Sequence, residues 1–562
     1  MKYSYKCILL TILNSVFLFF YSFSQTTPSW AWAKSASDSN NQWGNSIETD
    51  DFGNIYVSDT FYNSITLDSV TLNDNGLSDI FLAKYNSNGT LLWSKGIGGN
   101  NNEGIYWNSI ISDSTGNIYM TGTFCSDSIS FATVTLYSSG SLCDMYTVKF
   151  DTNGNVLWAK GTGNNGWGQA IIGDKSDNIF ITGQSNSTNF IFDTISLSTS
   201  NLHFYILKCD SNGNALWAKS AGGDHFNVPT SMGTDNSNNL YVTGYFTGDS
   251  IVFDSLILYN HNTLNNRDIF IAKYNSSGNL LWAKSLGGNK ADEGIDIIID
   301  SSENIYVTGD FWSDSIAFDY FILHKSSALS FSSDMFLVKY DTSGTVVWAK
   351  NTTGANNVFA NSLNTDDTGH IYLAGNFEGD SIVFDNLTLN NLGEKDIFLT
   401  KYDELGNVIW IKGAGGLNDD NVNSLCLDDF GSIYLSGFFQ SSTINFGSIL
   451  LTNYDSSASS SDAFIAKLDV ATGIADLQSS VFHLKFFPNP FTTQSKLTFK
   501  NSNKETFLFT LYDITGRVTE TFSTTSDEII LSKGIKQAGV YMFNLTNGKN
   551  EERWSGKVII TN

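Results

Sequence analysis

The chain of 562 residues has few basic residues, few prolines and few histidines, and each shortage excludes a class of protein. Its 31 lysines and arginines face 56 aspartates and glutamates, which gives a net charge of −25 at pH 7. Nucleic acids and anionic membrane surfaces attract clustered cations, so we expect neither as a partner. Only 15% of the residues are charged and 41% are hydrophobic, a composition that excludes a disordered chain.

The motifs of common enzymes and zinc sites are also missing. The six histidines form no His-x-x-x-His or His-Glu-x-x-His pair, so we expect no zinc site. There is no Gly-x-Ser-x-Gly elbow and no Gly-x-x-x-x-Gly-Lys-Ser/Thr loop. Four prolines contrast with 48 glycines and abundant Asn, Asp, Ser and Thr, and helical periodicity is absent. This composition predicts an all-β protein with many tight turns.

Residues 1–24 have the features of a signal peptide. Two lysines precede an apolar stretch, residues 8–20, which is shorter than the roughly 20 residues that span a bilayer. Small residues then allow cleavage before Gln25. The alternative is a membrane anchor, which the short apolar core disfavours. We therefore expect an exported mature protein without a transmembrane segment.

Four of the five cysteines remain after this cleavage. Cys125 ends one predicted strand and Cys143 begins the next, so antiparallel pairing would bring them side by side. A disulfide there would close a 19-residue loop and stabilise the fold by about 3 kcal/mol. The alternative is two unrelated buried thiols. We interpret Cys209 and Cys426 as packing residues.

Three short signatures recur seven times each and divide the middle of the chain into repeats. The first is Trp-(Ala/Ser/Ile)-Lys, at Trp32, Trp93, Trp158, Trp217, Trp282, Trp348 and Trp410. The second is an Asp-led turn before an apolar strand, at Asp50, Asp113, Asp174, Asp235, Asp300, Asp366 and Asp428. The third is an apolar run ending in lysine, at Lys84, Lys149, Lys208, Lys273, Lys339, Lys401 and Lys467.

Each repeat is predicted to form four main strands, in the first repeat residues 45–49, 54–61, 79–85 and 91–95. Strands such as residues 304–309 are apolar on both faces, which favours sheets stacked radially, as in a β-propeller. A glycine ends six of the seven second strands and indicates close approach of a neighbouring blade. An extra hairpin is expected between the second and third strands at Ser128, Ser250, Ser315 and Ser381.

The seventh repeat has no Trp-x-Lys strand after Lys467, whereas residues 30–34 supply one directly after the signal peptide. We infer that this N-terminal strand completes the last blade, because an unpaired edge there would promote aggregation. Residues 25–476 are therefore predicted to form a seven-bladed β-propeller closed by an N-terminal strand.

The repeats also match a known pattern. Gly-Gly-x-x-x-x, near residues 98–103, 222–227 and 287–292, is followed by Asp-x-x-Gly-Asn-Ile-Tyr-Val-x-Gly and then Asp-x-Phe-x-x-Lys. In these motifs the chain resembles the bacterial β-propeller repeat family often labelled SBBP. The resemblance implies the propeller fold and an extracellular location, with no set chemistry.

After a linker predicted at residues 477–486, residues 487–562 contain six or seven short strands, which predicts a small immunoglobulin-like sandwich. Four motifs occur in order: Phe-Pro-Asn-Pro, Leu-Tyr-Asp-Ile-Thr-Gly-Arg-Val, Gly-Val-Tyr and Gly-Lys-Val-Ile-Ile. Their characteristic residues are Pro488, Asn489, Pro490, Gly516, Gly539, Tyr541, Gly556 and Lys557.

In these motifs the segment resembles the type A sorting domain of type IX secretion, with Phe487 in place of the commoner tyrosine. The resemblance implies a bacterium of the Bacteroidota and transit through the periplasm. It also implies binding to the type IX secretion machinery, with release or attachment at the outer cell surface.

Two sets of repeat residues are weighed as sites. The aspartates that open the first turns, Asp50 to Asp428, either bind Ca²⁺ or cap their own backbone. Capping is favoured, because no Asp-x-Asp-x-Asp-Gly loop occurs. We expect no other cofactor. The 14 repeat lysines are expected to form ion pairs and packing contacts between blades rather than a basic patch.

Aromatic residues in the connections from one blade to the next are the candidate binding residues: Trp43, Trp107, Trp167, Phe226 and Phe359. Such loops gather at one mouth of a propeller channel, where aromatic faces stack on sugars. The alternative is that these rings are wedges between blades.

Our first hypothesis is a non-enzymatic binding or adhesion module at the cell surface, with a glycan or a surface protein as partner. The alternative is a carbohydrate-active enzyme or glycan receptor with its site at the channel mouth. An enzyme should break the repeat pattern with convergent Asp, Glu or His residues on one face, and no such break stands out in the sequence.

Overall fold

The structure, a computed structural model, describes residues 28–36, 42–104, 109–138, 143–162, 165–198, 203–223, 225–261, 266–327, 329, 331–455, 460–469, 486–487, 491–499, 504, 506–513, 517–534, 536–547 and 553–561. The predicted signal peptide and nearly all of the predicted linker lie outside these residues. The chain folds into two compact units, Met1–Ala471 and Thr472–Asn562. Each is described by itself.

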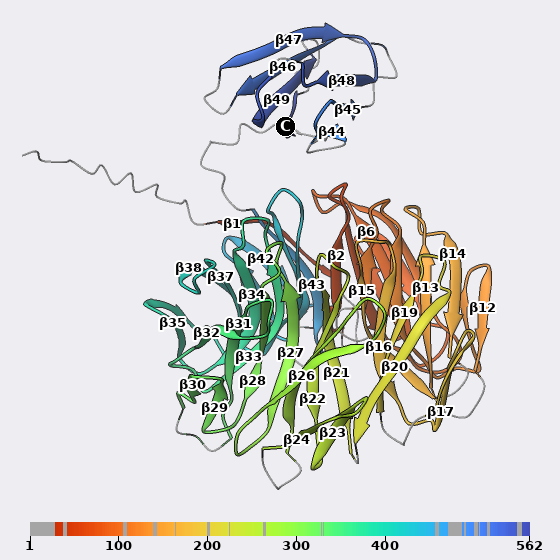
Figure 1. Ribbon diagram of the computed structural model, residues 1–562, viewed down its shortest axis with the longest axis vertical. Coiled ribbons are helices and arrows are strands. Elements are labelled where there is room, and N and C mark those ends of the chain that lie inside the picture. The colour runs from red at the N-terminus through yellow and green to blue at the C-terminus, as the bar shows by residue number, and fades with distance from the viewer. Residues whose placement is uncertain are drawn as a thin grey trace, which may run out of the picture. The chain divides into compact units, whose positions relative to one another are not determined.

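The described part of the first unit is built of β-strands, and 29 main strands form seven sheets, which we number 1 to 7 in chain order (Figure 1). The first strands are β2 (Ser46–Thr49), β8 (Glu103–Gly104) with β9 (Ile110–Ser112), β15 (Gly166–Gly173), β21 (Asn227–Thr234), β27 (Asp292–Ile299), β33 (Asn357–Thr365) and β39 (Asp420–Leu427). The second strands are β3 (Ile55–Phe61), β10 (Ile118–Phe124), β16 (Ile179–Ser185), β22 (Leu240–Phe246), β28 (Ile305–Phe311), β34 (Ile371–Glu378) and β40 (Ile433–Phe439).

The third strands are β6 (Asp79–Tyr85), β13 (Asp144–Phe150), β19 (His203–Cys209), β25 (Asp268–Tyr274), β31 (Asp334–Tyr340), β37 (Lys395–Tyr402) and β43 (Asp462–Asp469). The fourth strands are β7 (Leu91–Ile97), β14 (Val156–Gly161), β20 (Ala215–Gly223), β26 (Leu280–Leu286), β32 (Val346–Asn351), β38 (Val408–Ala414) and β1 (Ser29–Ala36). Within each sheet the strands pair antiparallel in the order first, second, third, fourth.

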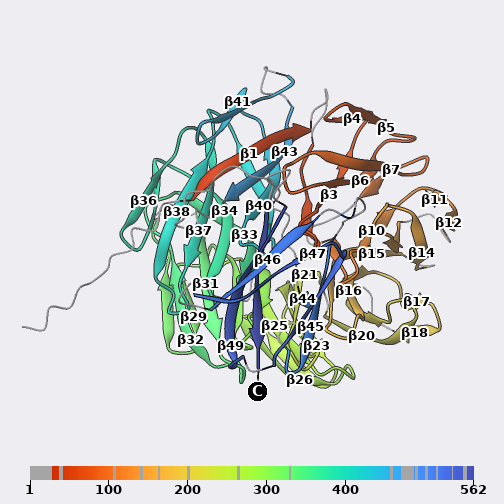
Figure 2. The same cartoon turned by 90° about the horizontal axis from the view of Figure 1, so that it is seen from above.

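The fourth strand of sheet 7 comes from the other end of the chain. β1 pairs antiparallel with β43, from Ser29 opposite Asp469 to Ala36 opposite Ala463. Figure 2 shows the red β1 lying beside the blue β43. The pairing expected from the sequence between the N-terminal strand and the last sheet is therefore present.

The sheets follow one another around an axis (Figure 2). The first strand of each sheet packs against the first strand of the next, and β39 of sheet 7 packs against β2 of sheet 1. The series of sheets thus returns to its start, and the first strands lie innermost.

A two-stranded hairpin follows the second strand in all seven sheets, whereas the sequence predicted it in four. The hairpins are β4–β5 (Ser64–Leu67, Val70–Asn73), β11–β12 (Ser128–Phe131, Val134–Tyr137), β17–β18 (Asn189–Phe192, Ile195–Ser198), β23–β24 (Ser250–Phe253, Leu256–Tyr259), β29–β30 (Ser315–Phe318, Phe321–His324), β35–β36 (Ser381–Phe384, Leu387–Asn390) and β41–β42 (Thr443–Phe446, Ile449–Thr452). Each has a two-residue turn whose first residue has positive φ, a conformation that Asp and Gly tolerate. That turn, rather than the Ser-Ile pair, is the constant feature.

The glycine near the end of six second strands is approached by the neighbouring sheet, as expected: a Cβ on Gly44 of sheet 1 would lie 2.3 Å from the carbonyl oxygen of Gly437 in β40 of sheet 7. A Cβ on Gly244 would lie 2.0 Å from the carbonyl oxygen of Val228, so a close backbone approach does require glycine. Val228 belongs to the first strand of the same sheet, so these glycines are approached from within the sheet as well. The cause is a β-bulge between Pro229 and Ser231, which pushes this carbonyl toward the second strand.

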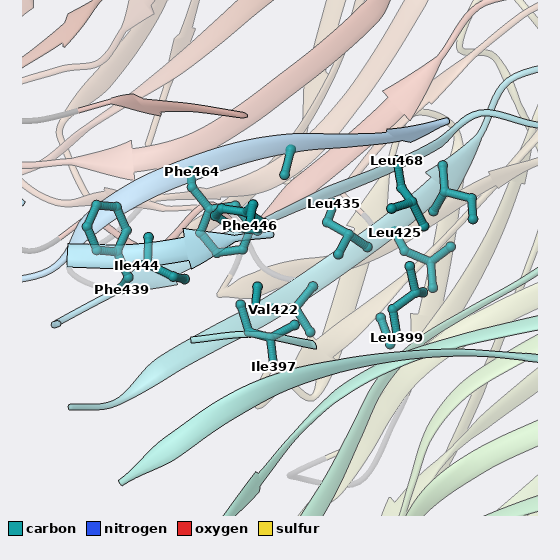
Figure 3. Packing of buried hydrophobic residues seen from close by; sticks show 14 of the residues in the cluster. Ile397, Leu399, Val422, Leu425, Leu435, Phe439, Ile444, Phe446, Phe464 and Leu468 are labelled. Atoms are coloured by element: carbon teal, nitrogen blue, oxygen red, sulfur yellow. The ribbon is translucent and has the colours of Figure 1, made fainter. Parts of the chain in front are cut away.

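The core lies between the sheets. Ile305 and Val307 of β28 pack toward sheet 4, and Tyr306 between them packs toward sheet 6, so the predicted burial on both faces is confirmed. Between sheets 6 and 7, Ile397 and Leu399 of β37 face Val422 and other apolar residues of sheet 7 (Figure 3).

Tryptophan and lysine side chains join neighbouring sheets by hydrogen bonds. In sheet 1, Trp93 Nε1 and Lys84 Nζ both donate to the carbonyl oxygen of Thr152 in sheet 2, at 3.3 and 3.2 Å. In sheet 7, Trp32 from β1 and Lys467 from β43 both donate to the carbonyl oxygen of Ser87 in sheet 1, at 3.2 and 3.5 Å. The same pair of bonds is made by sheets 2, 3 and 5, so the N-terminal strand makes the inter-sheet contact typical of the fourth strands.

The lysine of Trp-x-Lys forms a second link, which we call the clasp. It reaches the first turn residue of the hairpin in the next sheet, at N–O distances from 2.7 to 3.7 Å. The five clasps are Lys34–Asp68, Lys160–Asp193, Lys219–Asp254, Lys284–Asp319 and Lys350–Asp385. The predicted ion pairs between neighbouring sheets are thus confirmed for five of the 14 repeat lysines. Lysines of the third strands pair instead within their own sheet, as Lys84 does with Asp50 at 3.6 Å.

Two turns lack the acid of the clasp, because Ala132 and Gly447 stand in its place. The lysines equivalent by repeat position are Lys95 and Lys412. Ala132 has a φ of 54°, which Asp tolerates better than Ala. We expect Ala132→Asp to raise the unfolding free energy by about 0.5–1 kcal/mol through a clasp with Lys95. Denaturant titration measures this change. Ala132→Asn is the control, because Asn tolerates the positive φ as Asp does but has no charge to pair with Lys95. Equal stability of the Asp and Asn variants at low salt would contradict the clasp.

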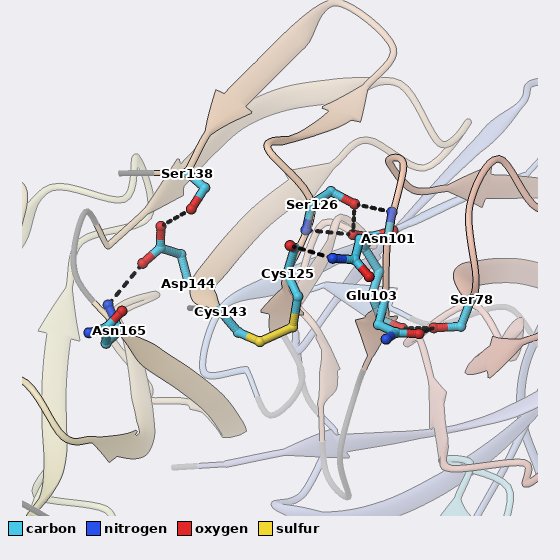
Figure 4. The surroundings of a disulfide bond; sticks show 10 residues. Ser78, Asn101, Glu103, Cys125, Ser126, Ser138, Cys143, Asp144 and Asn165 are labelled. Carbon is cyan, nitrogen blue, oxygen red and sulfur yellow. Dashed lines mark hydrogen bonds between the residues drawn. A yellow bond between two sulfur atoms is a disulfide. The ribbon is translucent and has the colours of Figure 1, made fainter. Parts of the chain in front are cut away.

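A disulfide joins Cys125, directly after β10, to Cys143, directly before β13 (Figure 4). The ladder between these strands ends with Phe124 opposite Asp144, so the two cysteines are its next pair. This is the pairing expected from the sequence. Cys209 and Cys426 are free and buried.

The second unit contains two sheets in its described residues. One is formed by β44 (Phe486–Phe487), β45 (Gln494–Thr498) and β48 (Glu528–Ser532), and the other by β47 (Val518–Thr524), β46 (Phe507–Asp513), β49 (Gly539–Asn547) and β50 (Arg553–Ile560). The last strand, β50, pairs with β49 along its whole length, from Arg553 opposite Thr546 to Ile560 opposite Gly539. Phe509, Phe543 and Leu545 lie in a common apolar core.

Candidate binding face

The connections between consecutive sheets lie at one end of the first unit, together with the connections that follow the second strands. We call the aromatic residues there the aromatic face: Trp43, Trp167, Phe226, Trp312 and Phe359. Four of them were predicted from the sequence. Trp107, the fifth predicted residue, lies outside the described residues.

Trp43 is 38% exposed and packs edge to face on Phe438 of sheet 7, with 4.9 Å between the ring centroids. Its backbone N–H donates to Asp59 at 2.8 Å. Asp59 replaces the glycine found at the end of the other second strands, and burial raises its pKa to about 6 despite the backbone donors around it. Trp43 is therefore partly an inter-sheet wedge.

Phe359 of β33 makes a similar contact across sheets 5 and 6. Its ring centroid lies 6.4 Å from that of Trp312, and Lys395 Nζ lies 5.3 Å from it. Lys395 also pairs with Glu378 at 3.5 Å. Sequence reasoning missed Trp312, although a position-by-position alignment of the repeats would have found it directly after the second strand.

The other two rings differ in exposure. Trp167 of β15 is half-buried, and its carbonyl oxygen accepts a hydrogen bond from the hydroxyl of Tyr205 at 2.9 Å. Phe226, directly before β21, is 59% exposed. Phe226 is thus the most accessible described ring of the aromatic face.

Sheets 4 to 6 also contain a break in the repeat that the sequence analysis overlooked. Glu293 of β27 and Asp310 of β28 are cross-strand partners, and both are buried. Arg267 pairs with Glu293 and stacks on Tyr245, 4.9 Å from the ring centroid. Asp310 accepts the backbone N–H of Ala360 at 2.9 Å, and burial raises its pKa well above its usual range.

The turn aspartates act as caps. Asp50 Oδ1 accepts the backbone N–H groups of Phe52 and Asn54, at 3.0 and 2.8 Å, and Oδ2 accepts the hydroxyl of Tyr56 at 3.2 Å. The capping interpretation is therefore confirmed. Burial raises the pKa of the equivalent Asp113, but hydrogen bonds from Thr115, Asn117 and Lys149 outweigh it and bring the pKa to about 2.

A pocket of about 200 Å³ lies on the axis of the ring, where all seven first strands contribute to its wall. It lies toward the end of these strands that leads into the Asp turns. Most of its side chains are apolar, such as Ile111, Ile172 and Ile298, while Glu48 and Asn364 are polar. No sequence pattern predicted this pocket. The described residues contain no helix long and apolar enough to cross a membrane.

The sorting motifs fall on both sides of the described boundary. Tyr541 is buried in β49, and its hydroxyl donates to the carbonyl oxygen of Gln537 at 2.9 Å, while Gly539 begins the same strand. Gly556 and Lys557 lie in β50, opposite Phe543 and Met542. The remaining motif residues, Pro488, Asn489, Pro490 and Gly516, lie outside the described residues.

Part of the chain is similar to an uncharacterized WD repeat-containing protein of Acanthamoeba polyphaga mimivirus, with 28% identity over 330 residues. That match covers 47% of this chain and 24% of the viral protein, so the chain spans about a quarter of its curated relative.

Two solved structures show weak similarity. PorZ, an essential bacterial surface component of the type IX secretion system of Porphyromonas gingivalis, has 8% identity and a TM-score of 0.20, covering 94% of this chain and 100% of that one. A puromycin hydrolase has 8% identity and a TM-score of 0.39, covering 82% and 59%. Similarities at this level define neither a fold nor an activity.

Residues 485–561 match the family model of the secretion system C-terminal sorting domain. This segment includes all four motifs on which the sequence resemblance was based. The protein therefore carries a sorting domain that directs it by type IX secretion to the cell surface or the extracellular space.

Proposed function

We propose that the first unit is a seven-bladed β-propeller of SBBP-like repeats, closed by β1, and that the second unit is an immunoglobulin-like sorting sandwich. The order of strands in each sheet, the contact between β39 and β2, and the pairing of β1 with β43 support the propeller. The two sheets around one apolar core support the sandwich.

We further propose that the exported protein is a non-enzymatic binding or adhesion module whose partner contacts the aromatic face. The carrying observation is that the rings of this face vary from sheet to sheet, while the Trp, Lys and Asp contacts of the framework repeat. A rigid framework with variable connections at one end is the usual arrangement of a binding protein. The partner is proposed to be a glycan or a surface protein.

The alternative, a carbohydrate-active enzyme, is favoured by the two opposed carboxyl groups of Glu293 and Asp310 near Trp312. Both groups are engaged, however, since Glu293 pairs with Arg267 and Asp310 caps Ala360. A general acid or base must be able to reach its substrate, so these contacts support binding over hydrolysis.

A binding screen of the mature protein against glycans and extracted surface proteins tests this proposal. We expect saturable binding that weakens at least tenfold in Trp167→Ala and Phe226→Ala, because aromatic anchors dominate such interfaces. Tyr320→Ala is the matched control, since this ring is 98% exposed on an outer hairpin. No binding in the screen, or equal losses in all three variants, would refute the proposed face.

A further inference from the structure

Glu48 departs from the repeat in the wall of the axial pocket. It lies in β2, opposite Tyr56 of β3, and the equivalent positions of sheets 2, 3 and 5 are Ile111, Ile172 and Ile298. All four residues line the pocket. The remaining equivalents are Gly233, Asn364 and Cys426, so this position varies between sheets and Glu48 is the one acid among its seven residues.

The surroundings of Glu48 do not balance its charge. Its hydrogen-bond partner is Ser112 of sheet 2, whose hydroxyl lies 3.4 Å from Oε1, a long hydrogen bond, and whose backbone N–H also donates to the carboxylate. Among the described residues no lysine, arginine or histidine pairs with Glu48. The charged and titratable groups that act on it are Asp50 and Asp51 of its own turn and Cys426 of sheet 7.

The other acid in the wall is different. Asp296 Oδ1 accepts the hydroxyl of Ser231 at 2.5 Å, and Oδ2 accepts the backbone N–H of Leu363 at 2.7 Å. Asp296 therefore links sheets 4, 5 and 6. Glu48 links only sheets 1 and 2, through Ser112, and the burial of its carboxylate opposes the charged form.

A buried acid whose charge its surroundings do not balance is expected at a functional site. We propose that the axial pocket binds an alkylammonium group, with the Glu48 carboxylate pairing with the ammonium and Ile111, Ile172 and Ile298 packing on the hydrocarbon chain. The net charge of −25 favours the approach of such a cation. This site is separate from the aromatic face and does not depend on it.

Binding has a proton balance that can be measured. Burial raises the pKa of Glu48 to about 8, with smaller contributions from Asp50 and Asp51. At pH 7 the empty site is therefore mainly protonated, and pairing with an ammonium releases one proton to solvent. Apparent affinity should rise about tenfold per pH unit below pH 8 and level off above it.

The test is calorimetric titration of the full chain with n-pentylammonium chloride, with n-pentanol as the uncharged control. We expect saturable binding of the amine with proton release at pH 7, and no saturable binding of the alcohol. The alkylammonium group can come from the lysine side chain of a protein or from a free amine. A lysine derivative blocked at both backbone ends distinguishes these two ligands, because a site for a protein's lysine binds it and a site for free amines does not.

Glu48→Ile is the matched variant, since it restores the residue of sheets 2, 3 and 5. It should fold with an unfolding midpoint equal to or above that of the parent and should lose at least tenfold in amine affinity. Equal binding of pentanol and pentylammonium, unchanged affinity in Glu48→Ile, or a lower midpoint in that variant would overturn the proposal. In the last case Glu48 would be a structural residue.

Discussion

Deletion of residues 28–36 is expected to abolish the cooperative thermal transition of the first unit and to cause aggregation. The deletion removes β1, with Trp30 and Trp32, and exposes the apolar edge of β43. Burial of two such rings contributes about 2–3 kcal/mol each, and the whole unit has a stability of only about 5–15 kcal/mol. An unpaired strand edge also promotes association between chains.

Calorimetry and light scattering measure this effect. A synthetic peptide of residues 28–36, added in excess, should restore a transition, because it can occupy the same edge. A truncated protein with the parental midpoint would show that β1 is not part of the closed ring.

The second large expected effect is a dependence of the unfolding free energy on pH. It arises from pairs of carboxyl groups at three junctions between sheets. At the junction of sheets 4 and 5, Asp292 accepts the backbone N–H of Gly288 at 2.8 Å and the hydroxyl of Ser313 at 2.7 Å. The nearby Asp268 bonds His261 through Oδ2, while its buried Oδ1 has no partner. The same arrangement occurs as Asp79 with Glu103 and as Asp396 with Asp420, and Figure 4 shows Glu103 beside Ser126.

Burial raises the pKa of four of these carboxyl groups, and the neighbouring carboxyl group adds to the rise in Asp79, Asp292 and Asp420. The pKa of Asp292 and Asp420 rises to about 7 and that of Asp79 and Asp396 to about 6. Between pH 4 and pH 7 the folded state therefore binds more protons than the unfolded chain. The unfolding free energy should fall as the pH rises through this window and stay low above it.

We expect the thermal midpoint to be clearly higher at pH 5 than at pH 8, with a difference in stability of about 3 kcal/mol or more. Below pH 4 stability should fall again, since the turn carboxylate of Asp113, with a pKa of about 2, loses its ionic contacts. Calorimetry over pH 3–9 measures the curve.

Asn variants isolate the carboxyl pairs. An amide already stands at the equivalent position in sheets 1 and 4, as Gln42 and Asn227, so the framework tolerates it. Asp292→Asn and Asp420→Asn should raise the midpoint at pH 8 and change it little at pH 5. A midpoint that is independent of pH, or a loss of stability in both variants at pH 8, would contradict the view that these buried carboxyl groups are protonated in the folded state at pH 5.

The sequence predicted the framework because the framework repeats. Seven copies of Trp-x-Lys made it plain that residues 30–34 belong to the last sheet, and the ladder of β1 with β43 bears this out. The hairpins were found only where Ser-Ile recurs, since their true constraint is a positive φ that Asp68 and Gly447 satisfy equally. A backbone conformation of this kind has no single residue signature.

The candidate site was harder to predict, because its residues are the ones that do not repeat. Trp43 and Phe359 stood out as aromatic residues, but their partners Phe438 and Trp312 come from neighbouring sheets. Glu48 is visible in the sequence only after the repeats are aligned residue by residue. Which side chains face the axis depends on the bulges of the first strands, and no sequence pattern marked those bulges.

The closure of the ring by β1 is tested most directly by an engineered disulfide. Ala33 and Ala466 are direct partners in the ladder of β1 and β43, so Ala33→Cys with Ala466→Cys should form a bond under mild oxidation. Both pairs of substitutions are made in a protein that lacks the free thiols of Cys209 and Cys426. The control pair is Ala33→Cys with Ala83→Cys, because Ala83 occupies in sheet 1 the position that Ala466 occupies in sheet 7. We predict cross-linking of the first pair alone, detected as one joined peptide after proteolysis. Absence of that peptide, or equal cross-linking in the control pair, would contradict a ring closed by the N-terminal strand.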